Sequence, residues 1–377
     1  IYLHTALEPG KYGRAASGLA VAWMLTDRSE YADRACDLLL QMAPYQYRAE
    51  NYDVGMNYTG WGVAALTACD ILGARFSASE RRAVDGMMTR LAAAVLKNDI
   101  FWIENGIGGG INNHLAWHKA MLGLLGLFYD RPDLVRFCVS GPRGLLPLLE
   151  DGLLDDGLWC ESSLNYHFTA IIPMVWFAEG QRRTGTRPTL YEITGANGRT
   201  LKQPFDAMFN VLSADGMIPP IGDTYGYHAR LHDNPLYESA WAAWRDEHYA
   251  WLLRRKKDRG LQSLFSPPLP ESPPAPPART ILLPEHGYAL LRSHTDDAYW
   301  DTDARCAFLT CDRSNVHAHA DRLTLILFGQ KRLLLTDIEA KSTAPHAFSS
   351  RIQGELNRGG LSQNTVMIDG ADQRTSP

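Results

Sequence analysis

The chain has 377 residues, of which 45% are hydrophobic, and its formal net charge at pH 7 is only −5. A chain of this length and apolar content buries a large core and exceeds one average domain, so we expect two domains. Its basic residues are scattered, and the one dense run, RRKKDR at residues 254–259, predicts a solvated helix end. This distribution excludes a nucleic-acid-binding surface as the main feature of the protein.

Cysteine spacing and hydropathy narrow the class of protein further. The six cysteines are spread out without a CxxC pair, which indicates neither a disulfide framework nor a thiolate metal site, so most are expected in the core. No apolar stretch reaches the length of a membrane span. The first residues, IYLHTALEPG, lack signal-peptide features, and the sequence starts as if within a longer protein. We favour a periplasmic or secreted location and leave a cytoplasmic one open.

Helical periodicity dominates the sequence from about Arg14 to about Arg255. Ser77 and Glu80 have the spacing of a capping box before one of the apolar runs. Helical hairpins in succession, without a repeat of fixed length, favour a toroid of helical hairpins over a regular solenoid. The segments with helical spacing are GRAASGLAVAWML, YADRACDLLLQM, GWGVAALTACDIL, RRAVDGMMTRLAAAVL, HLAWHKAMLGLLGLF, FTAIIPMVWFAEGQRR, PFDAMFNVL and ESAWAAWRDEHYAWLLRR.

Proline ends the helical region. The segment SPPLPESPPAPP, residues 266–277, lacks many backbone donors and predicts an extended linker. Short β-type runs follow, separated by Gly, Asp, Asn and Ser, and predict an antiparallel domain, as a sandwich that looks unfinished at its C-terminus. We therefore expect a helical catalytic domain at 1–260, a linker at 261–278 and a β-domain at 279–377. The predicted strands are RTILLP, GYALLRS, RCAFLTC, RLTLILFG, KRLLLTD and NTVMIDG.

The first group of candidate residues surrounds the start of a predicted helix near residue 112. Asn112 and Asn113 are good N-cap residues, so capping is the alternative to a site role for at least one of them. His114 and His118 share a helix face, but the HExxH pattern of a zinc site is missing. His114 beside a cap could present its ring to a cleft.

The second group, DDGLWCESSLNYHF, places Glu161, Tyr166 and His167 ahead of an apolar helix. A lone tyrosine in such a place is more often structural than catalytic. Several polar side chains before a helix that otherwise faces a core suggest instead that this end lines a pocket.

The third group, NVHAHADRL, places His317 and His319 ahead of an apolar strand, with Asp321 continuing the row. In extended conformation these side chains project from one face. Such a row could coordinate a divalent metal together with Asp337 of the neighbouring strand, and a polar strand edge is the alternative.

Aromatic and polar residues in MNYTGWG and PPIGDTYGYH have the composition of sugar-binding loops, with helix-end packing as the alternative for each. The second segment contains Asp223, Tyr225 and His228. The predicted substrate-binding residues are Asn57, Tyr58, Trp61, Asn112, Glu161 and Tyr225.

In this order, the motifs NNH, ESxxYH and HAHAD resemble those of the heparinase II/III-like polysaccharide lyases, which include alginate and oligoalginate lyases. The resemblance covers most of the chain. It implies an α+β multidomain fold with an incomplete (α/α) toroid followed by an antiparallel β-sandwich, and β-elimination of uronate-containing glycans. By motif position, Asn113 and His114 match the residues that neutralise the uronate carboxylate. Tyr166 matches the catalytic tyrosine, and His317 the catalytic histidine of the β-domain.

The resemblance also implies a zinc site, at which this sequence departs from the pattern. The first two ligand positions match His319 and Asp337, while the third is occupied by Gln363, a poorer zinc ligand than histidine. We therefore expect that no cofactor is required, with a structural zinc and metal-free polar contacts as equal alternatives.

The expected partner is an anionic, uronate-containing glycan, and the expected reaction removes the C5 proton of a uronate after its carboxylate is neutralised. His114 or Tyr166 would act as the base, depending on the face that carries the proton. Two other classes stay open. A glycoside hydrolase would need paired carboxylates, for which Asp155, Asp156, Glu161 and Asp223 are candidates. In a glycan-binding protein without catalysis, loss of the Tyr166 hydroxyl would not change the function.

Overall fold

The computed structural model of the chain describes residues 2–47, 54–106, 110–224, 229–311, 317–336, 356, 358–371 and 373. The chain divides into two compact units. Unit 1 comprises Ile1–Leu148 and Trp176–Leu190, and unit 2 comprises Leu149–Val175 and Tyr191–Pro377. Among the described residues, no helix is long and apolar enough to cross a membrane. The domain boundaries predicted at residues 261 and 279 stay a prediction.

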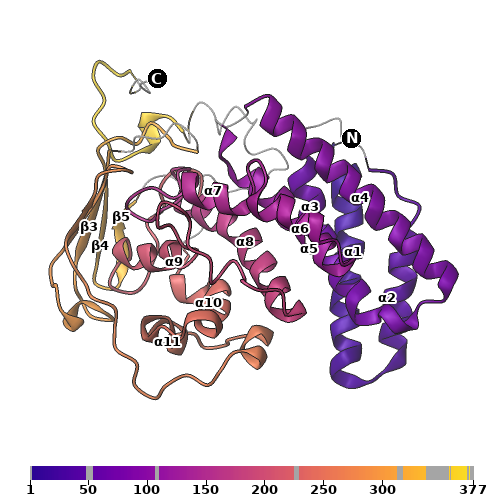
Figure 1. Ribbon diagram of the computed structural model, residues 1–377. Helices are drawn as coiled ribbons and strands as arrows, with labels where there is room; N and C mark the ends of the chain where they lie inside the picture. Colours follow the sequence, from indigo (N-terminus) through magenta and orange to yellow (C-terminus); the bar gives the residue numbers. More distant parts are fainter. Residues whose placement is uncertain are drawn as a thin grey trace. The chain divides into compact units, whose positions relative to one another are not determined.

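Unit 1 is helical, as the periodicity predicted (Figure 1). The predicted capping box forms at the start of α4, where the Glu80 backbone N donates to Ser77 Oγ at 3.3 Å and the Ser77 backbone N donates to Glu80 Oε2 at 2.8 Å. Two short helices, α6 and α7, were not predicted from the sequence. The bounds are α1 Tyr2–Thr26, α2 Ser29–Met42, α3 Val54–Leu72, α4 Ala78–Glu104, α5 Asn113–Phe128, α6 Pro132–Ser140, α7 Leu145–Gly152 and α8 Leu164–Thr184.

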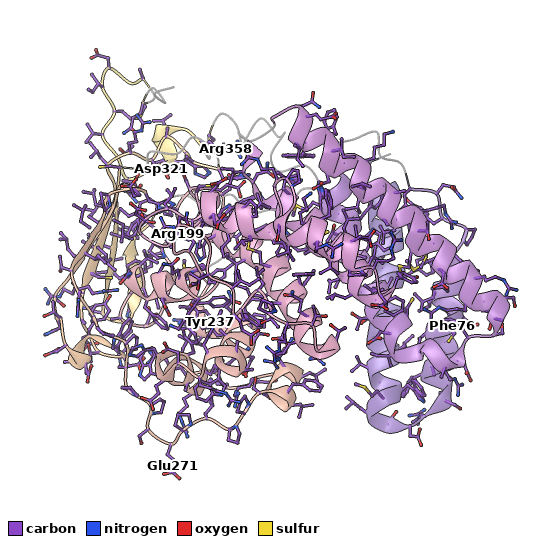
Figure 2. All side chains as sticks on the ribbon, viewed as in Figure 1. Phe76, Arg199, Tyr237, Glu271, Asp321 and Arg358 are labelled. Atoms are coloured by element: carbon purple, nitrogen blue, oxygen red, sulfur yellow. The ribbon has the colours of Figure 1, made fainter. Side chains whose placement is uncertain are left out.

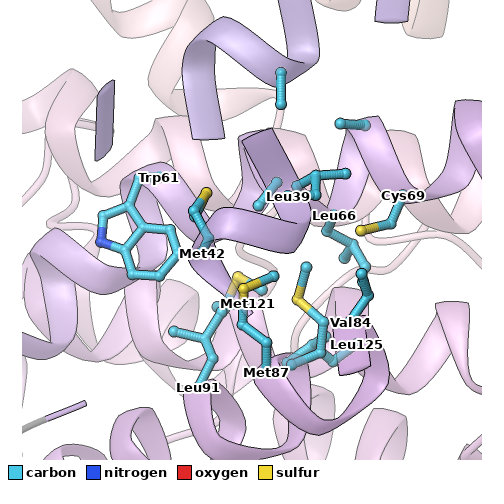
Figure 3. Packing of buried hydrophobic residues seen from close by; sticks show 14 of the residues in the cluster. Leu39, Met42, Trp61, Leu66, Cys69, Val84, Met87, Leu91, Met121 and Leu125 are labelled. Carbon is cyan, nitrogen blue, oxygen red and sulfur yellow. The ribbon is translucent and has the colours of Figure 1, made fainter. Parts of the chain in front are cut away.

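The core of unit 1 lies between α1, α2, α3, α4 and α5 (Figure 3). Leu39, Trp61 and Met121 contribute fully buried side chains to it. Gly62 allows α3 to approach α4 closely, because a Cβ atom there would lie only 2.7 Å from Leu91 Cδ2. The unit therefore has a continuous apolar core of the kind that the helical spacing predicted.

Unit 2 contains the short helices α9 Gln203–Ala207, α10 Leu236–Trp244 and α11 Glu247–Arg254. The sequence predicted one helix across α10 and α11, and this was wrong. Arg245 adopts a left-handed conformation with φ of 56°, and Asp246 then caps α11 by accepting from the His248 backbone N at 2.9 Å. A cap inside the run outweighs the continuous apolar spacing.

The proline-rich segment contains no helix or strand and packs within unit 2. Its carbonyl oxygens accept hydrogen bonds from Trp241 Nε1 at Pro267, Arg254 Nε at Pro270 and Trp300 Nε1 at Pro276, at 3.0, 2.6 and 2.7 Å. Proline keeps its acceptor while losing its donor, so such a segment suits neighbours that donate.

The strands form one antiparallel sheet in the order β1-β2-β3-β4-β5 (Figure 1). The predicted strand NTVMIDG was wrong, because within it the structure has only an isolated bridge from Ile368 to Ala371. The strand bounds are β1 Ile281–Leu283, β2 Tyr288–Arg292, β3 Cys306–Thr310, β4 Thr324–Gly329 and β5 Arg332–Leu335.

The two faces of the sheet differ in burial but not in polarity. On the inner face, Leu290, Phe308 and Ile326 are paired across β2, β3 and β4 and are fully buried. On the outer face the side chains are again apolar, yet Leu291 is 56% exposed. Leu282 and Leu334 are also exposed there. Alternation of apolar and polar residues is expected where a sheet faces water, so this outer face is unusual.

Candidate functional site

Tyr166 and His317, the predicted catalytic pair of unit 2, are in direct contact. Tyr166 lies in the first turn of α8, and its ring stacks on the His317 imidazole with centroids 3.4 Å apart and planes 12° from parallel. Ser163, just before this helix, accepts from the Asn165 backbone N at 3.2 Å and donates from Oγ to the Asp223 carbonyl oxygen at 2.9 Å. The start of α8 is thus tied to the loop that carries Asp223.

The backbone around His317 is unusual. His317 has φ of 60°, a region that non-glycine residues seldom adopt. Its carbonyl oxygen accepts from the Asp223 backbone N at 3.0 Å. A Cβ atom at position 222 would lie 2.4 Å from the same oxygen, so Gly222 is needed for this approach. Backbone strain of this kind is typical of functional sites.

The carboxylate of Asp223 is the centre of the cluster. It accepts from His317 Nδ1 at 2.9 Å, from His319 Nε2 at 3.0 Å and from Arg358 Nη2 at 2.7 Å (Figure 2 labels Arg358). The side chain is fully buried. Burial would raise its pKa, but hydrogen bonds from the two histidines and the charge of Arg358 outweigh burial and hold the pKa of Asp223 well below its usual range.

Glu161 approaches His317 from the other ring nitrogen. Its Oε1 lies 3.8 Å from His317 Nε2, and its Oε2 accepts from Trp159 Nε1 at 2.7 Å. Glu161 is only 3% exposed. Of the residues predicted for the site, Glu161, Tyr166, His317 and His319 are therefore gathered in unit 2.

Two buried histidines anchor the segment that carries Trp159 and Glu161. His167 Nδ1 accepts from the Trp159 backbone N at 3.1 Å. His286 Nε2 donates to the Trp159 carbonyl oxygen at 2.9 Å, and its Nδ1 lies 2.7 Å from Asp156 Oδ2. Burial would raise the pKa of Asp156, but hydrogen bonds from His286 outweigh it and lower that pKa.

The remaining predicted catalytic residues lie at the start of α5 in unit 1. Asn112 is the N-cap, with its side-chain oxygen accepting from the Leu115 backbone N at 3.2 Å, which confirms the capping alternative for this residue. Asn113 is buried as the first residue of the helix. The His114 ring stacks on Trp102 with centroids 4.2 Å apart.

A buried charged group lies in the same unit. Lys119 Nζ and Asp99 Oδ2 are 2.7 Å apart, with both side chains fully buried. His118 Nδ1 lies 3.8 Å from Asp99 Oδ1, and burial, with the nearby His114 and Lys119, keeps the pKa of His118 well below its usual value. His118 is therefore a neutral core histidine.

The predicted sugar-binding residues of α3 divide into two kinds. Asn57 is exposed, whereas Tyr58 and Trp61 are 1% and 2% exposed and belong to the unit 1 core. Their burial favours the packing alternative. Tyr225 lies outside the described residues.

The zinc site that the resemblance implies stays a prediction, because one of its three positions lies outside the described residues. Both ring nitrogens of His319 face protein groups, with Nε2 against Asp223 Oδ1 and Nδ1 3.3 Å from Gln363 Nε2. Asp337 lies outside the described residues. In the described part of the chain, no group of three His, Cys, Asp or Glu side chains is placed to hold a metal. We assign no chemical step to a metal.

Sequence reasoning missed Arg358 and the central position of Asp223. Asp223 was noted only as a polar loop residue and a hydrolase candidate. In the structure, Asp223 is marked by the positive φ of the preceding Gly222, and the sequence alone does not reveal this angle. Arg358 stands in a polar stretch before two glycines and carries no signal of its own.

Solved structures with the same fold are polysaccharide lyases by their titles. A heparinase III matches with TM-score 0.65 and 14% identity over 94% of this chain and 53% of that one. A second heparinase III gives 0.62 and 14% over 95% and 55%. The heparan sulfate lyase HepC from Pedobacter heparinus gives 0.57 and 15% over 86% and 48%. The chain thus spans about half the length of these structures. The chain is rich in helices, contains a five-stranded antiparallel sheet and has the fold of heparinase III.

The family follows from the sequence match. The alginate lyase family model matches residues 10–216, which is more than half of the chain. The chain belongs to the alginate lyase family. A search of curated proteins gives no match.

Proposed function

We propose that the protein cleaves uronate-containing polysaccharides or oligosaccharides by β-elimination and leaves a 4,5-unsaturated uronate at the new end. The observation that carries this proposal is the stacking of Tyr166 on His317, with the Asp223 carboxylate behind the imidazole. A phenol and an imidazole in contact are a pair that can donate and accept protons at one position. Membership in the alginate lyase family supports the same class of reaction.

In the proposed reaction, charge neutralisation comes first. Removal of the C5 proton adds negative charge beside a carboxylate that is already anionic, so donors must stabilise that carboxylate. Asn113 and His114 take this role by their match to the family motif. Each such donor is typically worth about 10²–10³-fold in rate.

Proton transfer follows. His114 or Tyr166 removes the C5 proton, depending on the sugar face that carries it, and Tyr166 protonates the departing O4. The C5–H and C4–O bonds break, the electron pair from C5 forms the C4–C5 double bond, and the leaving oxygen gains the proton. Each transfer typically contributes about 10²–10⁴-fold.

The hydrolase alternative is disfavoured by three of its four candidate carboxylates, Asp155, Asp156 and Asp223. A glycosidase needs a carboxylic acid whose pKa is raised so that it can protonate the leaving group. The pKa of Asp223 and that of Asp156 are instead lowered by hydrogen-bonded histidines. Asp155 is exposed and paired with Arg199. None of these three groups has the environment of a general acid.

For the complete fold we propose an incomplete (α/α) toroid of helical hairpins followed by an antiparallel β-sandwich. The succession of helices in unit 1 supports the toroid. The apolar outer face of the sheet supports the sandwich, because a second sheet would bury these leucines.

The proposal is tested by incubating the purified protein with a panel of alginate, heparin, heparan sulfate and hyaluronan, while recording the absorbance of unsaturated uronate products. We expect activity on at least one polymer, and Tyr166→Phe should reduce it by about 10²-fold or more. The matched control is Tyr237→Phe, which removes a tyrosine hydroxyl elsewhere in unit 2, one that donates to the Phe205 carbonyl oxygen at 2.9 Å. This control should keep the activity. No product from the whole panel, or undiminished activity in Tyr166→Phe, would contradict the proposal.

A further inference from the structure

Asp223 takes no part in the proposed proton transfers, yet it contacts more of the site than any residue that does. Its Oδ2 accepts from His317 Nδ1 and Arg358 Nη2, and its Oδ1 accepts from His319 Nε2. Its backbone N and carbonyl oxygen are bound to His317 and Ser163. A side chain held at every polar atom is rigid and can orient the groups that it binds.

These contacts fix the protons on both imidazoles. An ionised carboxylate only accepts hydrogen bonds, so His317 must carry a proton on Nδ1 and His319 one on Nε2. The other nitrogen of His319 faces the Gln363 amide nitrogen, a donor, which leaves that ring neutral. His317 Nε2 is thus the ring atom that can gain or lose a proton without breaking the contact with Asp223.

Two acidic groups flank His317. Asp223 accepts from its Nδ1, and Glu161 Oε1 lies 3.8 Å from its Nε2. Arg358 binds the same Asp223 oxygen as His317 and so helps to hold that carboxylate in place.

We propose that Asp223 is the positioning residue of this site. It holds His317 with Nδ1 protonated so that Nε2 is the atom that meets the substrate, and Arg358 helps to hold the carboxylate in place. This inference rests on the proposed lyase function and deepens it. It also gives His319 and Gln363 a role as hydrogen-bonding supports of Asp223.

The kinetic test compares kcat and KM in two variants. Asp223→Asn should lower kcat by about 10²-fold or more, with a smaller change in KM, because the imidazole loses its fixed tautomer. Arg358→Gln leaves the contact between Asp223 and His317 in place and should lower kcat by less. The matched control is Asp215→Asn, because Asp215 is also paired with an arginine, Arg230, at 2.9 Å but has no contact with His317 in the structure. This control should keep the kcat of the wild type.

The structural test does not depend on activity. Nitrogen-15 labelling of histidine, with His317→Gln to assign the signal, reports the tautomer and titration of His317 by NMR in each variant. We expect the neutral ring to carry its proton on Nδ1 in the wild type and to lose this preference in Asp223→Asn. Circular dichroism of each variant checks that it is folded.

The outcomes separate the inference from the function on which it rests. Lyase activity combined with the Nε2-protonated tautomer, or with an undiminished kcat in Asp223→Asn, overturns the inference and leaves the lyase function intact. The expected NMR pattern without cleavage of any polymer supports the positioning of His317 and overturns the lyase function. If the NMR pattern and the cleavage are both as expected, they support the positioning role of Asp223 and the lyase function.

Discussion

His167 and His286 differ in protonation although both are buried beside Trp159. His167 accepts at Nδ1 from a backbone N–H and donates from Nε2 to the Pro204 carbonyl oxygen at 3.0 Å, so it is neutral. Burial lowers the pKa of His167 to about 4, although the contact with Pro204 acts against it. Each ring nitrogen of His286 faces an acceptor, Asp156 at Nδ1 and the Trp159 carbonyl oxygen at Nε2, so both nitrogens donate and the ring is charged.

At the residue scale, His167 should make stability depend on pH. Its folded pKa lies below the unfolded value of about 6.5, so the unfolded chain binds more protons and stability falls as the pH drops below about 6.5. Between about pH 7 and about pH 5, this group alone should remove about 2 kcal/mol from the free energy of unfolding. Denaturant unfolding of the wild type and His167→Asn should differ in pH dependence by that amount. The same slope in both proteins would contradict the protonation assigned to His167.

The turn between α7 and α8 is held by one buried pair from a distant element. Asp156 lies in this turn, and His286 precedes β2. Their side chains are each only 2% exposed. The Asp156 carboxylate also accepts from the His286 backbone N at 3.2 Å. This pair connects the sheet to the segment that carries Trp159 and Glu161.

At the element scale, breaking this pair should destabilise the protein strongly. Asp156→Asn leaves a buried imidazolium without its counter-charge and should cost about 3–5 kcal/mol in free energy of unfolding. Since the pKa of Asp156 is lowered by folding, its contribution is present above about pH 4 and is lost as the pH falls further. A double-mutant cycle with His286→Gln measures the coupling. The comparison pair is Arg131 and Asp133 on the surface, where Asp133→Asn should change the free energy of unfolding little. Equal losses of free energy of unfolding in Asp156→Asn and Asp133→Asn would contradict the role given to the Asp156–His286 pair.

Periodicity predicted the elements better than the contacts between them. The capping box at Ser77 and the helical runs are local, so their physics is contained in neighbouring residues. The break at Arg245 was missed because apolar spacing continues across it. The meeting of Tyr166 with His317 was anticipated only through the family resemblance, while Arg358 and His286 were not anticipated. Their partners, Asp223 and Asp156, lie far away in sequence, and no local pattern encodes such pairs.

The whole chain spans about half the length of the heparinase III structures that share its fold, and its sheet has one apolar face without cover in the described residues. Leu290 and Leu291 are neighbours on β2 that face opposite sides, with exposed fractions of 1% and 56%. The same residue type therefore occupies two environments at adjacent positions. Comparing substitutions at Leu290 and Leu291 therefore tests whether a second layer covers the outer face of the sheet.

At the scale of the whole molecule, Leu290→Ala should cost the 377-residue chain about 2–5 kcal/mol in free energy of unfolding, because it leaves a cavity in the core. Leu291→Ala should cost less than about 1 kcal/mol and should reduce binding of an apolar fluorescent dye to the outer face. Denaturant unfolding and dye titration measure the two effects. In a polypeptide whose further strands form the proposed sandwich, Leu291→Ala should become as costly as Leu290→Ala, because both side chains are then buried. Equal costs already in the 377-residue chain would mean that the outer face is covered without a second sheet from further sequence.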